Sequence, residues 1–231
     1  NYKAAVDCYE TGMVSSKNQK FWGLYLRYAF DLAFTYNELS LLDKSEPILD
    51  SAIEAGTRFF GTKSPFVAQI YENYGMLYFY KGMYEKSIEN YKNALTIKLA
   101  ALGEESVYLT TVYNNIALVY WEMEDFETAL TYLDKGTSLA KKYLGEKHPE
   151  VGSGYNNLST VYKNLGNYSQ ALEYAFKCLK IWEEVYGENN LYMGSIYNNI
   201  GNIYSKMDNF KNAEFYLKKS LEVLQIVFSE N

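Results

Sequence analysis

Residues 144–187 read LGEKHPEVGSGYNNLSTVYKNLGNYSQALEYAFKCLKIWEEVYG, and this stretch decides the fold because the chain repeats its pattern. Two of its glycines belong to a series in which each member follows the last by 42 residues: Gly61, Gly103, Gly145 and Gly187. Tyrosines keep the same interval at positions 71, 113, 155 and 197, and again at 78, 120, 162 and 204. A fixed period of roughly 20–50 residues is typical of solenoids, in which each repeat buries its apolar face against its neighbours.

One repeat predicts a pair of helices. Apolar residues recur at three- and four-residue steps from about residue 149 to 165, which is the pattern of an amphipathic helix A. Gly166-Asn167 predicts a turn, and helix B is expected to begin at Tyr168 and to end before Gly187. Ser159 interrupts the large residues of helix A, and its equivalents Gly75, Ala117 and Gly201 are also small. A small residue at one register of every repeat predicts that two helices press together there.

The ends of the helices carry their own signals. Each glycine of the 42-residue series is expected to stop a helix B in the left-handed conformation, which glycine adopts without a steric cost. His148 precedes Pro149, and its equivalents are Ser64, Ser106 and Asn190. Because each of these side chains can accept a hydrogen bond, we interpret them as N-caps of helix A. His148 is therefore expected to be a helix cap and not a general base.

Composition excludes several classes of function. The net charge is −6 and the sequence pI is about 5.0, and the chain has only two arginines, Arg27 and Arg58. Nucleic-acid binding, which needs a basic surface, is therefore not expected. No apolar run is long enough for membrane insertion. Cys8 and Cys178 are read as reduced thiols of a cytoplasmic protein. No spacing predicts catalytic residues, a metal site or a cofactor, so we do not expect an enzyme.

The register Tyr155, Leu158, Ser159, Tyr162, then Tyr168, Ala171 and Cys178, resembles the tetratricopeptide repeat. Its length of 42 residues, with Gly145, His148-Pro149, Val151 and Asn156-Asn157-Leu158, is similar to the repeats of kinesin light chains. The resemblance implies an all-α fold, a right-handed superhelical solenoid of antiparallel helix pairs. The expected division of this single solenoid is a partial repeat (helix B only) at 1–18, a divergent repeat at 19–61, and full repeats at 62–103, 104–145, 146–187 and 188–231.

Asparagines provide the candidate peptide-binding residues. They stand mid-helix, where asparagine is a mediocre helix former, yet the choice is repeated in every regular repeat. The resemblance implies that helix A lines a concave groove and that asparagine at this register bonds the backbone of an extended peptide, which concerns Asn73, Asn115, Asn157 and Asn199. The preceding residues Asn114, Asn156 and Asn198 are further candidates. The alternative is that these amides tie adjacent repeats together.

Other groove positions are expected further along helix A. They are Phe79, Tyr80, Trp121, Glu122, Lys163, Asn164 and Lys206, with Arg27, Phe30, Asp31 and Phe34 in the divergent repeat. The groove would be aromatic toward its N-terminal half and lysine-bearing toward its C-terminal half. Such a surface suits a peptide with apolar anchors and an acidic flank. Phe79 and Trp121 could instead pack against neighbouring helices.

Two functions follow from these expectations. The first is a protein–protein interaction scaffold that binds a peptide or helix of a partner in the concave groove. The second is a regulatory array that gates a kinase, protease or transcription regulator elsewhere in a longer chain. The start at Asn1, without methionine and within a repeat, fits such a segment.

Overall fold

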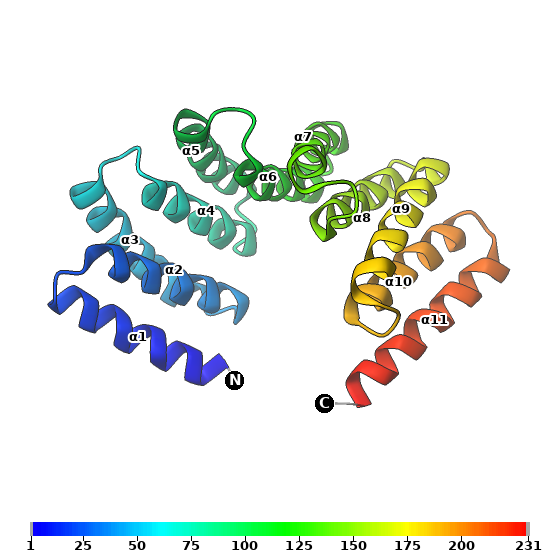
Figure 1. The fold of residues 1–231 in the computed structure, drawn as a ribbon, viewed down its shortest axis with the longest axis horizontal. Helices are drawn as coiled ribbons and strands as arrows, with labels where there is room; N and C mark the ends of the chain where they lie inside the picture. The colour runs from blue at the N-terminus through cyan, green and yellow to red at the C-terminus, as the bar shows by residue number, and fades with distance from the viewer. Residues whose placement is uncertain (1, 230–231) are drawn as a thin grey trace. The chain divides into compact units, whose positions relative to one another are not determined.

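The computed structural model describes residues 2–229, and every regular element in that range is a helix (Figure 1). The elements in chain order are α1 (Tyr2–Asn18), α2 (Trp22–Glu38), α3 (Leu42–Phe60), α4 (Pro65–Tyr80), α5 (Tyr84–Leu102), η1 (Val107–Leu109), α6 (Thr110–Glu122), α7 (Phe126–Leu144), α8 (Pro149–Asn164), α9 (Tyr168–Tyr186), α10 (Leu191–Lys206) and α11 (Phe210–Ser229). The expected all-α architecture of helical repeats is confirmed.

Helices A and B alternate along the chain as antiparallel hairpins (Figure 1). Helices A are α2, α4, α6, α8 and α10, and helices B are the odd-numbered ones from α1 to α11. The expected starts of helix B are confirmed at Tyr84, Phe126, Tyr168 and Phe210. One helix A departs from the pattern, because the 3-10 turn η1 precedes α6. Val107 stands there in place of the proline that starts α4 and α8, although α10 also starts without proline, at Leu191, and is regular from its first residue.

The predicted N-caps are confirmed, and His148 is one of them. Its Nδ1 accepts the backbone N–H of Glu150 at 3.2 Å. Ser64, Ser106 and Asn190 accept from the N–H groups of Val67, Tyr108 and Met193 at 3.3, 3.3 and 3.1 Å.

The glycines that end helices B differ from the expected left-handed conformation in one respect. Their φ is positive, as expected, but ψ is extended: Gly61 has φ 84° and ψ 159°, and Gly187 has φ 73° and ψ −173°. This region of conformational space is essentially restricted to glycine, whereas asparagine also enters the left-handed helical region. The extended ψ directs the chain away from helix B and toward the cap of the next helix A.

The chain forms two compact units, Asn1–Val119 and Tyr120–Asn231, and the boundary lies within α6. The core of the first unit joins α2, α3 and α4 around Leu26, Leu49, Ile70 and Leu77. The core of the second joins α8, α9 and α10 around Val151, Cys178, Ile196 and Ile200. Cys8 is exposed, Cys178 is buried, and both are free thiols.

The small residues of helix A are places of close helix contact, as predicted. A Cβ added at Gly75 would lie 2.7 Å from the ring of Tyr91, and one at Gly201 would lie 2.7 Å from Leu217. Ser87 of α5 donates its hydroxyl to the carbonyl of Gly75 at 2.6 Å. Close packing therefore also brings a buried serine within reach of the opposing backbone.

The tyrosine ladder joins helix A to helix B within a hairpin. The pairs Tyr120–Tyr132, Tyr162–Tyr174 and Tyr204–Tyr216 are stacked, with ring centroids 5.8, 5.5 and 5.7 Å apart. Asn90 takes the place of the helix-B tyrosine in the first regular repeat, and Tyr78 there stacks instead on Tyr74, at 6.1 Å. These rings are packing elements, as the sequence indicated.

No helix in residues 2–229 combines the length and the apolar character needed to cross a bilayer. Within the same residues, no group of three or more histidine, cysteine, aspartate or glutamate side chains could hold a metal ion.

Candidate functional site

The A-helix face, meaning the face built from α8 and α10 in the second unit and from α2 and α4 in the first, carries the candidate residues. Asn199 of α10 is the centre of the polar cluster in the second unit and is buried. Its amide donates to Asn156 Oδ1 at 3.2 Å and to Ser159 Oγ at 3.3 Å. Its Oδ1 accepts from Lys163 Nζ at 3.4 Å. These contacts join two adjacent repeats, which is the alternative that the sequence left open.

Asn73 has a different environment in the first unit. It is buried, and its Nδ2 donates to the carbonyl of Gln69 within α4 at 3.0 Å. The same register therefore serves two local purposes, a tie between repeats at Asn199 and a bond within one helix at Asn73.

Asn115 and Asn157 are half-buried, and in residues 2–229 neither side chain has a hydrogen-bond partner. Their amides are thus not engaged within the described residues, unlike that of Asn199. Among the neighbouring amides, Asn156 already accepts from Asn199, and Asn198 is exposed. Asn114 is half-buried, and its Oδ1 is shielded from solvent with no partner in the part of the chain that the structure describes.

The two aromatic candidates are half-buried. The ring of Phe79 lies 5.7 Å from that of Tyr80 and 6.0 Å from that of Tyr84, so it packs on its own hairpin. Trp121 stands at the same register of α6. Its Nε1 is buried and, among residues 2–229, has no hydrogen-bond partner.

Lys163 and Lys206 bring positive charge to the A-helix face of the second unit. Lys163 is half-buried near the end of α8, and Lys206 is exposed at the end of α10. Neither makes an ion pair with a carboxylate of the described chain. Burial, together with repulsion from Lys206, lowers the pKa of Lys163 below its ordinary value. The positive charges of the two lysines therefore repel each other, and neither has a carboxylate partner among residues 2–229.

An apolar groove of about 500 Å³ opens between α2 and α4 on the A-helix face of the first unit. Phe30 and Phe66 line it, with ring centroids 6.4 Å apart, and Leu24 is 44% exposed beside them. Arg27 is exposed at the groove. Of these residues, Arg27 and Phe30 were expected from the sequence and Leu24 and Phe66 were not.

Several polar contacts escaped the sequence reasoning. Tyr74 donates its hydroxyl to Asp50 at 2.5 Å, Tyr78 donates to Glu46 at 3.1 Å, and Tyr80 donates to Glu38 at 2.8 Å. Burial and the Glu38 carboxylate raise the pKa of Tyr80 to about 12. Glu38 and Tyr80 are one 42-residue period apart, so they hold the same position in adjacent repeats. That spacing is the feature of the sequence that could have predicted their contact.

A second missed contact is the ion pair of Glu72 and Lys98, which lies between α4 and α5. Glu72 occupies the position of the first asparagine of the pairs. Burial raises the pKa of the Glu72 carboxyl, and the charge of Lys98 offsets part of this effect. The sequence feature that could have predicted this ion pair is the replacement of the first asparagine of the pair by Glu72.

Solved structures share this fold at low sequence identity. BtubC (BKLC) from P. vanneervenii has a TM-score of 0.85 at 20% identity, over 98% of this chain and 92% of that chain. A putative kinesin light chain with TPR-like repeats from Podosopora anserina has a TM-score of 0.73 at 15% identity, over 86% and 93%. The apo form of RapI has a TM-score of 0.71 at 16% identity, over 100% and 67%. No curated protein sequence matches the chain.

The family follows from a direct sequence match. The model described as "Tetratricopeptide repeat" matches residues 25–100, 108–175 and 155–226, which together are well over half of the chain. The structural neighbours include kinesin light chain-like members with repeats of this kind. The chain therefore belongs to the tetratricopeptide repeat family.

Proposed function

We propose that the chain is a protein-interaction scaffold that binds a segment of a partner protein on its A-helix face, through an acidic residue and an apolar anchor. Tetratricopeptide repeats act mainly as non-enzymatic scaffolds that bind proteins. The observation that carries the proposal is the pair Lys163 and Lys206, two neighbouring cations without a carboxylate partner in the described residues. We expect no catalytic activity of the chain itself.

The electrostatic argument begins at Lys163. Its ammonium group is partly desolvated, and Asn199 Oδ1 at 3.4 Å gives it only a neutral acceptor. A carboxylate placed between Lys163 and Lys206 would remove their repulsion and replace a weak contact with charge-assisted hydrogen bonds. Asn157, whose amide has no partner in residues 2–229, stands on the same helix and could bond the backbone of the bound segment.

The apolar part of the proposal concerns the first unit. The groove at Phe30 and Phe66 is open and lined mostly by apolar side chains, and Arg27 adds one cation at its side. Burying an aromatic or leucine side chain there would gain roughly 1.5–3 kcal/mol.

The lysine pair gives the first test. Peptides of 12 random residues, displayed on phage and selected on the whole chain, are expected to be enriched in aspartate and glutamate. The double variant Lys163→Gln/Lys206→Gln is expected to bind the selected peptides about tenfold more weakly or worse, since it loses two charge-assisted contacts. Fluorescence anisotropy with labelled synthetic peptides measures the affinity.

The matched control is Lys180→Gln/Lys211→Gln, which removes the same charge from two exposed helix-B lysines. Asn157→Ala is also expected to weaken peptide binding. It should not lower the unfolding midpoint, because the Asn157 amide has no hydrogen-bond partner in the described chain. The proposal fails if the selected peptides carry no excess of acidic residues, or if the Lys163/Lys206 variant binds them as well as the control does.

The pH dependence gives a second test. Because the pKa of Lys163 is lowered, its charge is lost at a lower pH than that of an ordinary lysine. Affinity for an acidic peptide should be steady at neutral pH and should fall as the pH rises through that lowered pKa. Lys206→Gln removes one cause of the shift, so the decline should move to higher pH. Anisotropy titrations from about pH 7 to pH 10 measure this; an unmoved decline would contradict the role of the pair.

The regulatory alternative remains a prediction. One observation favours it: this fold covers 67% of the RapI chain, so in that protein further chain accompanies a helical array of this kind. The nucleotide sequence on both sides of the present coding region would test it, because an adjoining effector domain in the same reading frame is required.

A further inference from the structure

A second open groove lies in the first unit, between the helices B α1 and α3, with α2 as its floor. Its main section measures about 580 Å³ and is lined by Val14 of α1, Ile48 of α3 and Tyr36 of α2. A narrower section of about 170 Å³ continues toward Arg58. The two sections share Lys17, Tyr25 and Ser51, so they form one continuous groove, which we call the α1–α3 groove.

The α1–α3 groove has an apolar middle. Val14 is 55% exposed there, Met13 and Ile48 are half-buried, and the ring of Pro47 is exposed. The tyrosines of the floor, Tyr25 and Tyr36, are buried, and Tyr25 belongs to the core cluster of the first unit. Burying this middle strip is the main gain that a ligand could make here.

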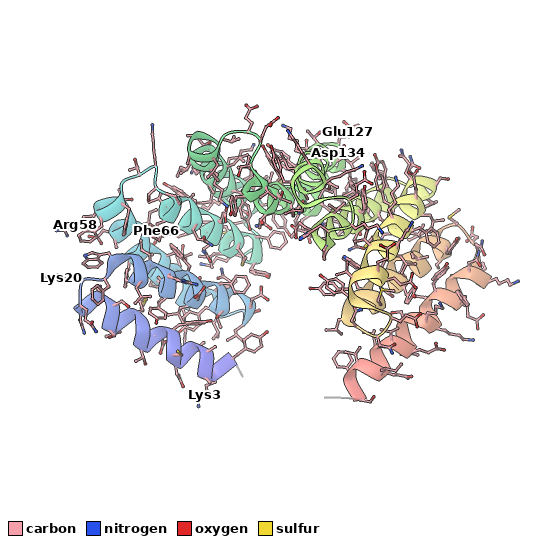
Figure 2. The ribbon with its side chains drawn as sticks, viewed as in Figure 1. Lys3, Lys20, Arg58, Phe66, Glu127 and Asp134 are labelled. Atoms are coloured by element: carbon pink, nitrogen blue, oxygen red, sulfur yellow. The ribbon has the colours of Figure 1, made fainter. Side chains whose placement is uncertain are left out.

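Charges without ion pairs stand at the two ends of the groove. Lys17, Arg58 and Glu54 line the end near the C-termini of α1 and α3. Glu10, Asp43 and Lys44 line the other end. One end is thus net positive and the other net negative. Figure 2 shows Lys20, which follows the C-terminal end of α1, on the same side as Arg58 of α3. Lys3 lies at the opposite end of α1.

None of these six side chains makes an ion pair with the described residues, although charges elsewhere in the same unit do, as in Lys81–Glu46 and Lys98–Glu72. Lys17 lies 5.8 Å from the centroid of the Tyr25 ring, and Lys44 lies 5.6 Å from that of Tyr36. Both lysines therefore lie over the floor tyrosines and face the groove. The Tyr36 hydroxyl also donates a hydrogen bond to Glu10 Oε1 at 2.5 Å, which holds that carboxylate at the floor. Charges that are held against the floor without a counter-charge can recognise a ligand of complementary charge.

We propose that the α1–α3 groove binds an amphipathic α-helix of a partner protein, with carboxylates at the Lys17–Arg58 end and a basic residue at the Glu10–Asp43 end. The walls and floor are helices, which bond most of their own backbone groups and offer no strand edge to an extended peptide. A helical ligand satisfies its own backbone and presents only side chains. From Asp43 to Arg58 the α3 wall rises roughly 22 Å, which matches about four helical turns of a ligand.

The test uses a phage-displayed library of 18-residue peptides whose fixed residues favour an α-helix. The positions of one apolar stripe and of the two ends of the peptide are randomised. Selection on the whole chain should yield helices with acidic residues at one flank and basic residues at the other. Val14→Glu and Ser51→Arg, both at exposed positions, should each weaken binding at least about tenfold. Calorimetry measures the affinities, and circular dichroism with urea unfolding checks that the variants fold.

Val185→Glu is the matched control, because Val185 is an exposed valine of α9 in the other unit. Selection on the charge-reversed variant Lys17→Glu/Arg58→Glu should yield helices that carry basic residues at the end where helices selected on the wild type carry acidic ones. Lys163→Gln/Lys206→Gln should leave helix binding unchanged, so this result stands apart from that for the A-helix face. The inference is wrong if selected helices bind Val14→Glu and Ser51→Arg as tightly as the wild type, or if charge reversal leaves their flanks unchanged.

Discussion

Replacing Gly75 with alanine is expected to destabilise the chain by about 2 kcal/mol, although alanine is the better helix former by about 1 kcal/mol. The new Cβ would lie 2.7–2.8 Å from three atoms of the Tyr91 ring, closer than such contacts occur. Tyr91 is only 3% exposed and cannot swing away without opening the core between α4 and α5. Urea unfolding followed by circular dichroism measures the change.

Gly23→Ala is the control for this prediction. Gly23 is also a glycine of a helix A, but an added Cβ would meet its nearest atoms at 3.7 and 3.8 Å, which is ordinary contact. That variant is therefore expected to gain up to about 1 kcal/mol from helix propensity alone. If both variants shifted the unfolding midpoint in the same direction, close packing at Gly75 would not be the cause.

Lys98→Ala is expected to cost about 2 kcal/mol, because it leaves the carboxylate of Glu72 buried without its partner. The side chain of Glu72 is 13% exposed and that of Lys98 is 20% exposed, so the pair is less costly to break than a fully buried one. The double variant Glu72→Asn/Lys98→Ala places asparagine and alanine where the next repeat has Asn114 and Ala140. It should recover most of the loss.

The pH dependence of Lys98→Ala separates this cause from a packing defect. The folded-state pKa of Glu72 is already raised above its ordinary value of 4.5, and loss of Lys98 raises it further. The penalty is therefore present above the folded pKa and disappears as the pH falls through it toward the unfolded pKa. The difference in unfolding free energy between Lys98→Ala and the double variant should shrink on acidification. A constant difference would show that the lost lysine stem, and not the unpaired carboxylate, is responsible.

Sequence periodicity predicted most of the fold for a physical reason. Every repeat faces the same neighbours, so the same local requirement recurs and is visible as a series in the chain. The N-caps at Ser64, His148 and Asn190, the close contact at Gly75 and the helix-B starts were all of this kind. The glycine series ends helices B, as predicted, but its extended ψ was not predicted. A glycine in the sequence indicates that φ is positive, and it does not indicate in which direction the chain continues.

The candidate site was less predictable, because equal registers do not have equal surroundings. Asn73 and Asn199 stand three repeats apart at one register. Nevertheless Asn73 bonds Gln69 within its own helix, whereas Asn199 bonds Asn156 and Ser159 of the preceding repeat. The difference lies in the opposing helix, where the residues are not the same. Periodicity cannot indicate which amide remains free, and only the structure shows that Asn157 has no partner in the described residues.

The sequence by itself determined the repeat, the order and ends of its helices, and the small residues at which they touch, because each depends on residues close in the chain or on an identical neighbour. The tertiary structure alone decided which charges are paired and which are not. Lys98 forms an ion pair with Glu72, whereas within residues 2–229 Lys163, Lys206 and the charged side chains of the α1–α3 groove form no ion pair. Charge pairing depends on distances between side chains of separate helices, and local pattern does not fix these.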